Sequence, residues 1–402
     1  RKLSFHDRAR MLKALGLFLN EKKKEFYAIS AATGATKGDS WIDIDGGIGT
    51  MLVFASKGRR ELPDQPFLVD GNMEMISKNG TFVGHHICVP LEGVALHINA
   101  FNFPVWGMLE KIAVNLLAGV PAIVKPASAT SYLTEYVVRE IVNSGILPEG
   151  ALQLVCGGVG DIFNHLTCQD VVTFTGSAHT GKMLKRHPMI VENSIRFNME
   201  ADSLNCCILG PDAEPGTEEF NLFIKEVSRE MTVKAGQKCT AIRRTIVPEH
   251  LTEAVIGALN ERLKNTVIGD PAVEGVRMGP LASMSQVNDV KDKVKQLLGD
   301  CEMVYGDLDN VSVVGGDSKR GAFISSMLLY CKDPFHKTSP HEIEAFGPVS
   351  TVMPYKTAEE AAQLAKMGKG SLVGSVITND NHFAREVVLG SASMHGRMLV
   401  IN

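Results

Sequence analysis

The chain has 402 residues, of which 45% are apolar and 21% charged, and its formal net charge is −4. At roughly 150 residues per domain this length predicts two or three compact units, and the composition is typical of a soluble α/β protein. The charge leaves no excess of Lys and Arg to neutralise phosphates, which argues against nucleic-acid binding, and no apolar run approaches the ~20 residues of a membrane span.

Residues 1–60 contain a long amphipathic run and are expected to be helical. The segment that follows carries Asp70-Gly71 and Asn79-Gly80, dipeptides typical of the turns of antiparallel hairpins. We expect this hairpin, placed at 76–93, to reach a neighbouring subunit, so that the protein is a homo-oligomer.

The next part of the chain alternates short apolar runs with amphipathic ones. The runs at 94–98, 122–125, 152–156 and 171–175 are predicted to be strands, with helices at 105–117 and 133–142 between them. Such repeated units predict a doubly wound, Rossmann-type parallel sheet with helices on both faces. A second alternation begins near Asp202, with a helix at 220–234, and we place a domain boundary there.

Eight cysteines show no Cys-x-x-Cys pair and no spacing with His that is typical of a metal site, so no metal is predicted. Free thiols in a chain without a secretory leader indicate a cytoplasmic protein. The chain begins with Arg1 and ends on an apolar segment, so we expect it to be part of a longer polypeptide.

The strand at 171–175 runs into a turn bracketed by Gly176 and Gly181, which opens a helix. A helix N-terminus at the carboxyl edge of a parallel strand suits a phosphate, although glycine loops are common. Lys125 ends another strand; it is either a solvated edge residue or, beside a bound dinucleotide, a ligand of the adenosine ribose.

Three further side chains stand at junctions: Asn102 before a predicted helix start, Glu200 at the domain boundary, and Cys239 after a Gly-Gln-Lys step. A buried cysteine is usually a small apolar residue and an asparagine there is usually a turn former. Together, however, a thiol, a carboxylate and an amide are what a covalent acyl-transfer site requires.

In chain order, the motifs N-F-P, K-P-A, F-T-G-S-x-x-x-G, a glutamate about 40 positions before G-Q-x-C, and E-x-F-G-P-V resemble the aldehyde dehydrogenase superfamily from about residue 90 onward. The phrases HINAFNFPVWGMLEK, MEADSLNCC and AGQKCTAIRR closely resemble the aldehyde dehydrogenase domains of bifunctional ring-opening proteins of phenylacetate degradation. The resemblance implies a dinucleotide-binding domain at 1–75 and 94–202, a bridging hairpin at 76–93 and an α/β catalytic domain at 203–402. A hydratase-like domain follows in those proteins.

The resemblance also implies roles for particular residues. Cys239 would attack the aldehyde, the Asn102 amide and the Cys239 backbone N–H would hold the oxyanion, and Glu200 would activate water. The glycine before the cysteine would allow close approach of substrate and cofactor. The implied cofactor ligands are Lys125, Ser128, Gly176, Ser177, Gly181, Glu344 and Phe346.

Two departures from the family pattern matter. After K-P-A, Ser128 replaces the glutamate of NAD-specific members, which leaves room for a 2′-phosphate and predicts NADP as the preferred cofactor, with NAD possible. After Glu200, Ala201-Asp202 replaces the usual Gly-Gly, which puts the mobility of the glutamate in question.

The predicted substrate is an aldehyde, a semialdehyde joined to coenzyme A in the proteins it resembles. A competing hypothesis is a CoA-acylating aldehyde dehydrogenase, in which coenzyme A replaces water; such enzymes generally lack the glutamate base. The sequence is also compatible with a catalytically silent relative, or with a cofactor-free cysteine hydrolase, which would need a His partner for its thiolate.

Overall fold

Two long helices begin the chain in the computed structural model, which describes residues 1–402. Helix α1 (Phe5–Ser30) starts at a capping box in which the Ser4 hydroxyl accepts from the Asp7 N–H and the Asp7 carboxylate accepts from the Ser4 N–H. Helix α2 (Lys37–Glu61) follows. The structure confirms the helical prediction for this region.

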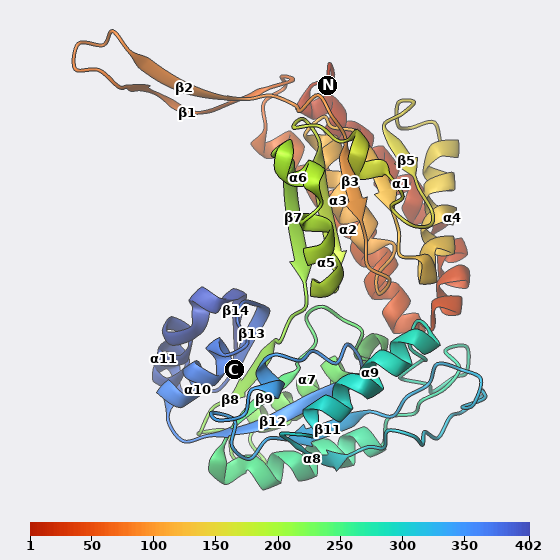
Figure 1. The fold of residues 1–402 in the computed structure, drawn as a ribbon, viewed down its shortest axis with the longest axis vertical. Helices are drawn as coiled ribbons and strands as arrows, with labels where there is room; N and C mark the ends of the chain where they lie inside the picture. The colour runs from red at the N-terminus through yellow and green to blue at the C-terminus, as the bar shows by residue number, and fades with distance from the viewer. The chain divides into compact units, whose positions relative to one another are not determined.

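The chain forms two compact units, one of residues 1–33 and 40–201 and the other of residues 34–39 and 202–402. Figure 1 shows the helices and strands of both units.

The first unit is built on a parallel five-stranded sheet of order β5-β4-β3-β6-β7. Its strands are β3 (Ala95–Ile98), β4 (Ala122–Lys125), β5 (Leu152–Leu154), β6 (Val171–Gly176) and β7 (Arg196–Ala201). The strands predicted at 94–98, 122–125 and 171–175 are confirmed, and the one predicted at 152–156 ends two residues early. The chain order reverses between β3 and β6, so the carboxyl ends of these strands form a topological switch point, where open α/β sheets bind ligands.

Helices cover both faces of this sheet, as the sequence predicts. Helices α3 (Trp106–Leu117) and α4 (Ser131–Asn143) pack with α1 in one core, and α5 (Ala178–Lys185) and α6 (Pro188–Glu192) pack in another. Successive side chains of β3 point to opposite faces of the sheet. Leu96 and Ile98 face α5 and α6, whereas His97 hydrogen-bonds to Asn115 of α3.

An antiparallel hairpin of β1 (Leu68–Met75) and β2 (Val83–Cys88) precedes the sheet. Its turn lies at Ser77–Gly80, where the Gly80 N–H donates to the Ser77 carbonyl. The predicted turn at Asp70-Gly71 is wrong, because Gly71, with φ of 73°, lies within β1 where the strand register shifts. The left-handed conformation of Gly71 therefore belongs to an irregularity within the strand and not to a turn.

The second unit contains a seven-stranded sheet of order β10-β11-β12-β9-β8-β13-β14, parallel except for β10. Its strands are β8 (Cys206–Leu209), β9 (Arg244–Pro248), β10 (Glu302–Tyr305), β11 (Met327–Tyr330), β12 (Val349–Tyr355), β13 (Ser371–Ile377) and β14 (His395–Ile401). Its helices are α7 (Glu218–Thr232), α8 (Thr252–Lys264), α9 (Met284–Leu297), α10 (Ala358–Lys366) and α11 (Asn381–Ser391). Helices α7 and α8 cover one face, and α9, α10 and α11 cover the other.

Short 3₁₀ segments connect these elements: η1 (Ala31–Thr33), η2 (Ser128–Thr130), η3 (Ile162–His165), η4 (Val233–Gly236), η5 (Glu249–Leu251), η6 (Ser339–His341) and η7 (Ala392–Met394). None of the helices combines the length and the apolar character that crossing a bilayer requires.

Candidate active site

Seven of the predicted site residues lie at or just beyond the carboxyl edge of the five-stranded sheet. They are Asn102 in the β3–α3 loop, Lys125 at the end of β4, Ser128 in η2, Gly176 at the end of β6, Ser177 and Gly181 at and within the start of α5, and Glu200 near the end of β7. The other three, Cys239, Glu344 and Phe346, belong to the second unit.

The β6–α5 turn is capped and tightly packed. Ser177 is the N-cap of α5, and its hydroxyl oxygen accepts from the Thr180 N–H at 3.3 Å. A Cβ on Gly181 would stand 2.6 Å from the Met199 sulfur, and one on Gly176 would stand 2.7 Å from the Phe174 ring. Both glycines therefore permit close packing of the turn on the sheet, and α5 begins directly after the carboxyl end of β6.

Lys125 and Ser128 differ in their surroundings. Lys125 is half-buried, its ammonium donates to the Pro126 carbonyl at 3.1 Å, and burial lowers the pKa of this ammonium while nearby Cys156 opposes that effect. Ser128 is exposed at the start of η2. Lys125 is therefore a cation at the end of β4, three positions before a small exposed hydroxyl.

Asn102 is buried, with 7% of its surface exposed, in a loop fixed at the start of α3. The Asp43 carboxylate of α2 accepts from the Val105 N–H at 3.1 Å and from the Trp106 N–H at 2.7 Å. Asp43 thus satisfies backbone donors at the start of α3, although the α3 N-cap residue has no capping side chain of its own.

Glu200 is held in the ladder between β6 and β7. It pairs with Thr175, and the next pair, Gly176 with Ala201, carries the strand one residue further. With alanine rather than glycine after Glu200, the backbone of this residue is part of regular sheet.

The sequence did not single out three polar residues on the same side of the sheet. Asn99 is 5% exposed and both its amide atoms lack a hydrogen-bond partner, as does the Thr175 hydroxyl. Glu110 of α3 is half-buried; burial raises the pKa of its carboxyl, nearby Lys111 lowers it, and Glu200 raises it. Two features of the sequence could have indicated these residues: Asn99 is a polar residue directly after an apolar strand, and Glu110 is an acidic residue within an apolar helix.

In the second unit, the cysteine loop, defined as residues 234–239, has an unusual backbone. Lys234 and Ala235 have φ of 51° and Gly236 has φ of 68°, so three successive residues are left-handed. For a non-glycine residue this conformation costs roughly 1–2 kcal/mol. Asp39 accepts from the Lys234 N–H at 2.7 Å, and the fully buried Gln237 side chain donates to the Lys234 carbonyl at 3.0 Å. These buried contacts hold the strained loop.

Gly236 is required because its backbone lies very close to another loop of the same unit. A Cβ there would stand 2.1 Å from the Gly347 carbonyl oxygen and 2.7 Å from the Pro348 Cα. The close approach that the structure shows is therefore to the backbone of the Glu344–Pro348 loop, whereas the sequence interpretation invoked substrate and cofactor.

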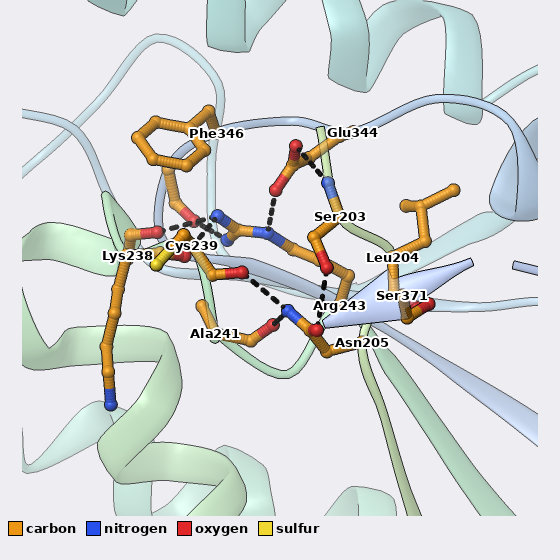
Figure 2. Close-up of polar contacts among 12 residues, drawn as sticks. Ser203, Leu204, Asn205, Lys238, Cys239, Ala241, Arg243, Glu344, Phe346 and Ser371 are labelled. Carbon is orange, nitrogen blue, oxygen red and sulfur yellow. Dashed lines mark hydrogen bonds and ion pairs between the residues drawn. The ribbon is translucent and has the colours of Figure 1, made fainter. Parts of the chain in front are cut away.

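Cys239 is half-buried, whereas four of the other cysteines are buried and three are exposed. Its carbonyl accepts from the Asn205 side-chain amide at 2.8 Å, and the same amide donates to the Ala241 carbonyl at 3.0 Å (Figure 2). The Asn205 side-chain oxygen in turn accepts from the Ser203 hydroxyl and the Val373 N–H. The backbone of Cys239 is thus fixed from β8 and β13.

Glu344 is held by two groups in Figure 2. Its carboxylate accepts from the Arg243 guanidinium at 3.2 Å and from the Ser203 N–H at 2.9 Å, with 7% of the side chain exposed. Burial raises the pKa of this carboxyl, while Arg243 and the Ser203 N–H lower it. The Phe346 ring lies 5.4 Å from the Arg243 guanidinium carbon.

Comparison with known proteins shows which family the chain belongs to. Residues 1–395 match the aldehyde dehydrogenase family. The 3,4-dehydroadipyl-CoA semialdehyde dehydrogenase of Aromatoleum evansii is 44% identical over 401 residues, which cover 100% of this chain and 78% of that protein. Protein MaoC of Klebsiella aerogenes is 40% identical over 126 residues, 31% of this chain and 36% of that protein. The chain spans 62% of the length of two Staphylococcus epidermidis relatives at 27% identity.

Solved structures show the same fold. Betaine aldehyde dehydrogenase from Staphylococcus aureus in complex with NAD⁺ has a TM-score of 0.84 and 23% identity, covering 99% of this chain and 75% of that chain. Succinic semialdehyde dehydrogenase from Streptococcus pyogenes in complex with NADP⁺ has a TM-score of 0.83 and 20% identity, covering 99% of this chain and 81% of that chain. From the family match and the identity along the whole chain, this protein is a member of the aldehyde dehydrogenase family and an oxidoreductase that acts on aldehydes.

Proposed function

We propose that the substrate is a semialdehyde joined to coenzyme A through a thioester, and that the product is the carboxylic acid. The observation that carries this proposal is the 44% identity along the whole chain to an enzyme named for such a substrate, 3,4-dehydroadipyl-CoA semialdehyde. The proposed metabolic setting is the degradation of aromatic compounds, including phenylacetate.

Cys239 is the proposed nucleophile. Its thiolate forms a bond to the aldehyde carbon, and the oxyanion that results accepts hydrogen bonds from the Asn102 amide and the Cys239 backbone N–H. A nicotinamide cofactor, when bound, would supply the acceptor for the hydride that leaves this carbon, and an acyl thioester would remain on the Cys239 sulfur. The fixed backbone of Cys239 supports this role, because the Asn205 amide holds its carbonyl oxygen in place.

Glu200 is the proposed general base. It takes a proton from water as the oxygen attacks the thioester carbon, and the Cys239 thiolate departs as the acid forms. In a CoA-acylating enzyme, free coenzyme A would attack instead of water. The presence of Glu200, half-buried and set in the β6–β7 ladder, favours hydrolysis.

NADP is the proposed cofactor in preference to NAD. Lys125 and Ser128 would accommodate the 2′-phosphate of the adenosine ribose, and Gly176, Ser177 and Gly181 would form the turn that holds the pyrophosphate. Glu344 would hold the nicotinamide ribose, with Phe346 beside it. The exposed Ser128 and the tight packing under the β6–α5 turn support these roles.

A homo-oligomer is proposed from the hairpin. Several large apolar side chains of the hairpin are exposed, including Met73, Met75 and Phe82, each at 60% or more. Exposed apolar patches of this kind on an excursion from the fold are typical of protein interfaces.

The test of the proposed function is absorbance of the reduced cofactor with a panel of aldehydes, with and without a CoA thioester. Substrate preference for the CoA-linked semialdehyde, with the free acid as product, supports the proposal. Acyl-CoA as the product, formed only when free coenzyme A is added, would favour the acylating enzyme. No reduction of either cofactor with any aldehyde would refute the proposal.

A further inference from the structure

Arg243 has no role in the chemistry above, yet its guanidinium is almost fully buried, with 4% of the side chain exposed. Its Nε donates to Glu344, one Nη donates to the Gly347 carbonyl at 2.6 Å, and the other donates to the Gly236 carbonyl at 2.8 Å and, at 3.5 Å, to the Lys238 carbonyl. Figure 2 shows this fork between the residues around Cys239 and those around Glu344.

These contacts join two segments that are about a hundred positions apart in the chain. The cysteine loop supplies the Gly236 and Lys238 carbonyls, and the Glu344–Pro348 loop supplies a carboxylate and the Gly347 carbonyl. The same two loops also touch directly, because a Cβ on Gly236 would stand 2.1 Å from the Gly347 carbonyl oxygen. A guanidinium offers several donors in a rigid plane, so it can satisfy all these acceptors at once.

The pair also places charge beside the backbone that leads into the nucleophile. The positive Arg243 guanidinium donates to the carbonyl of Lys238, the residue directly before Cys239. The same guanidinium also donates to the negative Glu344 carboxylate. A cation near a thiol favours the thiolate, and an anion opposes it. Screening by water is weak because both charged side chains are buried.

We propose that Arg243 is a positioning residue for Cys239: its fork fixes the cysteine loop against the Glu344–Pro348 loop, and its charge, balanced by Glu344, sets how readily the thiol ionises. This inference rests on the proposed role of Cys239 as the nucleophile. It also gives Glu344 a partner within the protein, Arg243, that does not depend on a bound cofactor.

The test is the pH dependence of alkylation of Cys239 by iodoacetamide without cofactor, followed by mass spectrometry of the Cys239 peptide. Arg243→Met removes the cation and is expected to raise the midpoint by about one pH unit, since a nearby charge typically has effects of this size. Glu344→Gln keeps the hydrogen-bond acceptor but removes the anion, and is expected to lower the midpoint by a similar amount. The double variant is expected to return close to the wild-type midpoint.

Arg244→Lys is the matched control. Arg244 is also fully buried, but it donates to the carbonyls of Leu204, Leu364 and Ala365, away from the cysteine loop. This variant is expected to lower the thermal midpoint while the alkylation midpoint stays in place. A merely structural role for Arg243 would give the same pattern as this control.

Midpoints that shift in the same direction in Arg243→Met and Glu344→Gln, or that do not shift in folded protein, would overturn the inference. If Arg243→Met does not fold, Glu344→Gln and Arg243→Lys carry the test, since the lysine keeps the charge and is expected to keep the midpoint near wild type. Alkylation needs no aldehyde, so normal turnover with unshifted midpoints refutes this inference alone. Shifted midpoints in a protein that oxidises no aldehyde refute the proposed function alone.

Discussion

Gly236 approaches Gly347 so closely that a Cβ on Gly236 would stand 2.1 Å from the Gly347 carbonyl oxygen. Two loops from distant parts of the chain therefore meet backbone to backbone beside the proposed nucleophile.

Gly236→Ala is expected to destabilise the protein by more than about 3 kcal/mol, because the left-handed φ of 68° and the backbone clash act together. Gly216→Ala is the matched control, since Gly216 has φ of 101° but open space around its Cβ position. It is expected to lose roughly 1–2 kcal/mol from backbone strain alone. Urea unfolding of both variants checks this, and equal losses would show that the contact with Gly347 is unimportant.

Ser128→Glu is expected to move cofactor preference from NADP toward NAD, because a carboxylate repels the 2′-phosphate and can bind ribose hydroxyls. The ratio of kcat/KM for NADP to that for NAD is expected to fall at least about tenfold, which corresponds to about 1.4 kcal/mol. Ala129→Glu adds the same charge one position along and serves as the control. A wild-type enzyme that prefers NAD, or an unchanged ratio in Ser128→Glu, would contradict the assignment.

Asn102→Ala is expected to lower kcat by about 100- to 1,000-fold, the usual effect of removing one oxyanion donor. The alkylation of Cys239 by iodoacetamide forms no oxyanion, so its rate is expected to stay near the wild-type value. Steady-state kinetics and alkylation measured on the same preparation separate the two effects. Loss of alkylation to the same degree as turnover would indicate that the substitution has damaged the protein.

The protein is expected to lose stability in acid because of the buried imidazole of His97. Burial lowers the pKa of this imidazole from 6.5 to about 4, and its two nitrogens contact Thr173 and Asn115. The unfolded chain binds the proton more tightly, so stability is complete above pH 6.5 and falls toward pH 4, by about 3 kcal/mol at most. In urea unfolding from pH 7 to 4, His97→Gln is expected to lose less stability than wild type. His165→Gln, at an exposed position, is the control and is expected to lose as much stability as wild type. Equal losses in all three would exclude His97 as the cause.

The sequence predicted what local patterns determine. The strand at 122–125 is an apolar run ended by Pro126, and Gly176 and Gly181 mark the β6–α5 turn, so the doubly wound sheet and this turn at its edge could be predicted directly. The roles of the site residues were implied by the family resemblance and stay predictions. The Asp70-Gly71 turn was wrong because a positive φ serves a strand irregularity as well as a turn.

Long-range contacts were beyond such patterns. Arg243 is one of two adjacent arginines where β9 begins, and nothing local indicates that it pairs with Glu344 at a separation of 101 residues. Asn99 likewise looks like a loop residue, and only the folded sheet shows that its amide is buried without a partner. Such residues are defined by what tertiary structure brings together.

The central claim is that Cys239 carries the acyl group and Glu200 releases it. The most direct measurement is mass spectrometry of Glu200→Gln quenched after mixing with NADP and a CoA-linked semialdehyde. The account predicts one reduced cofactor per chain in a rapid burst and the added acyl mass on the Cys239 peptide. Continued turnover by Cys239→Ala, or the acyl mass on another of the eight cysteines, would contradict it.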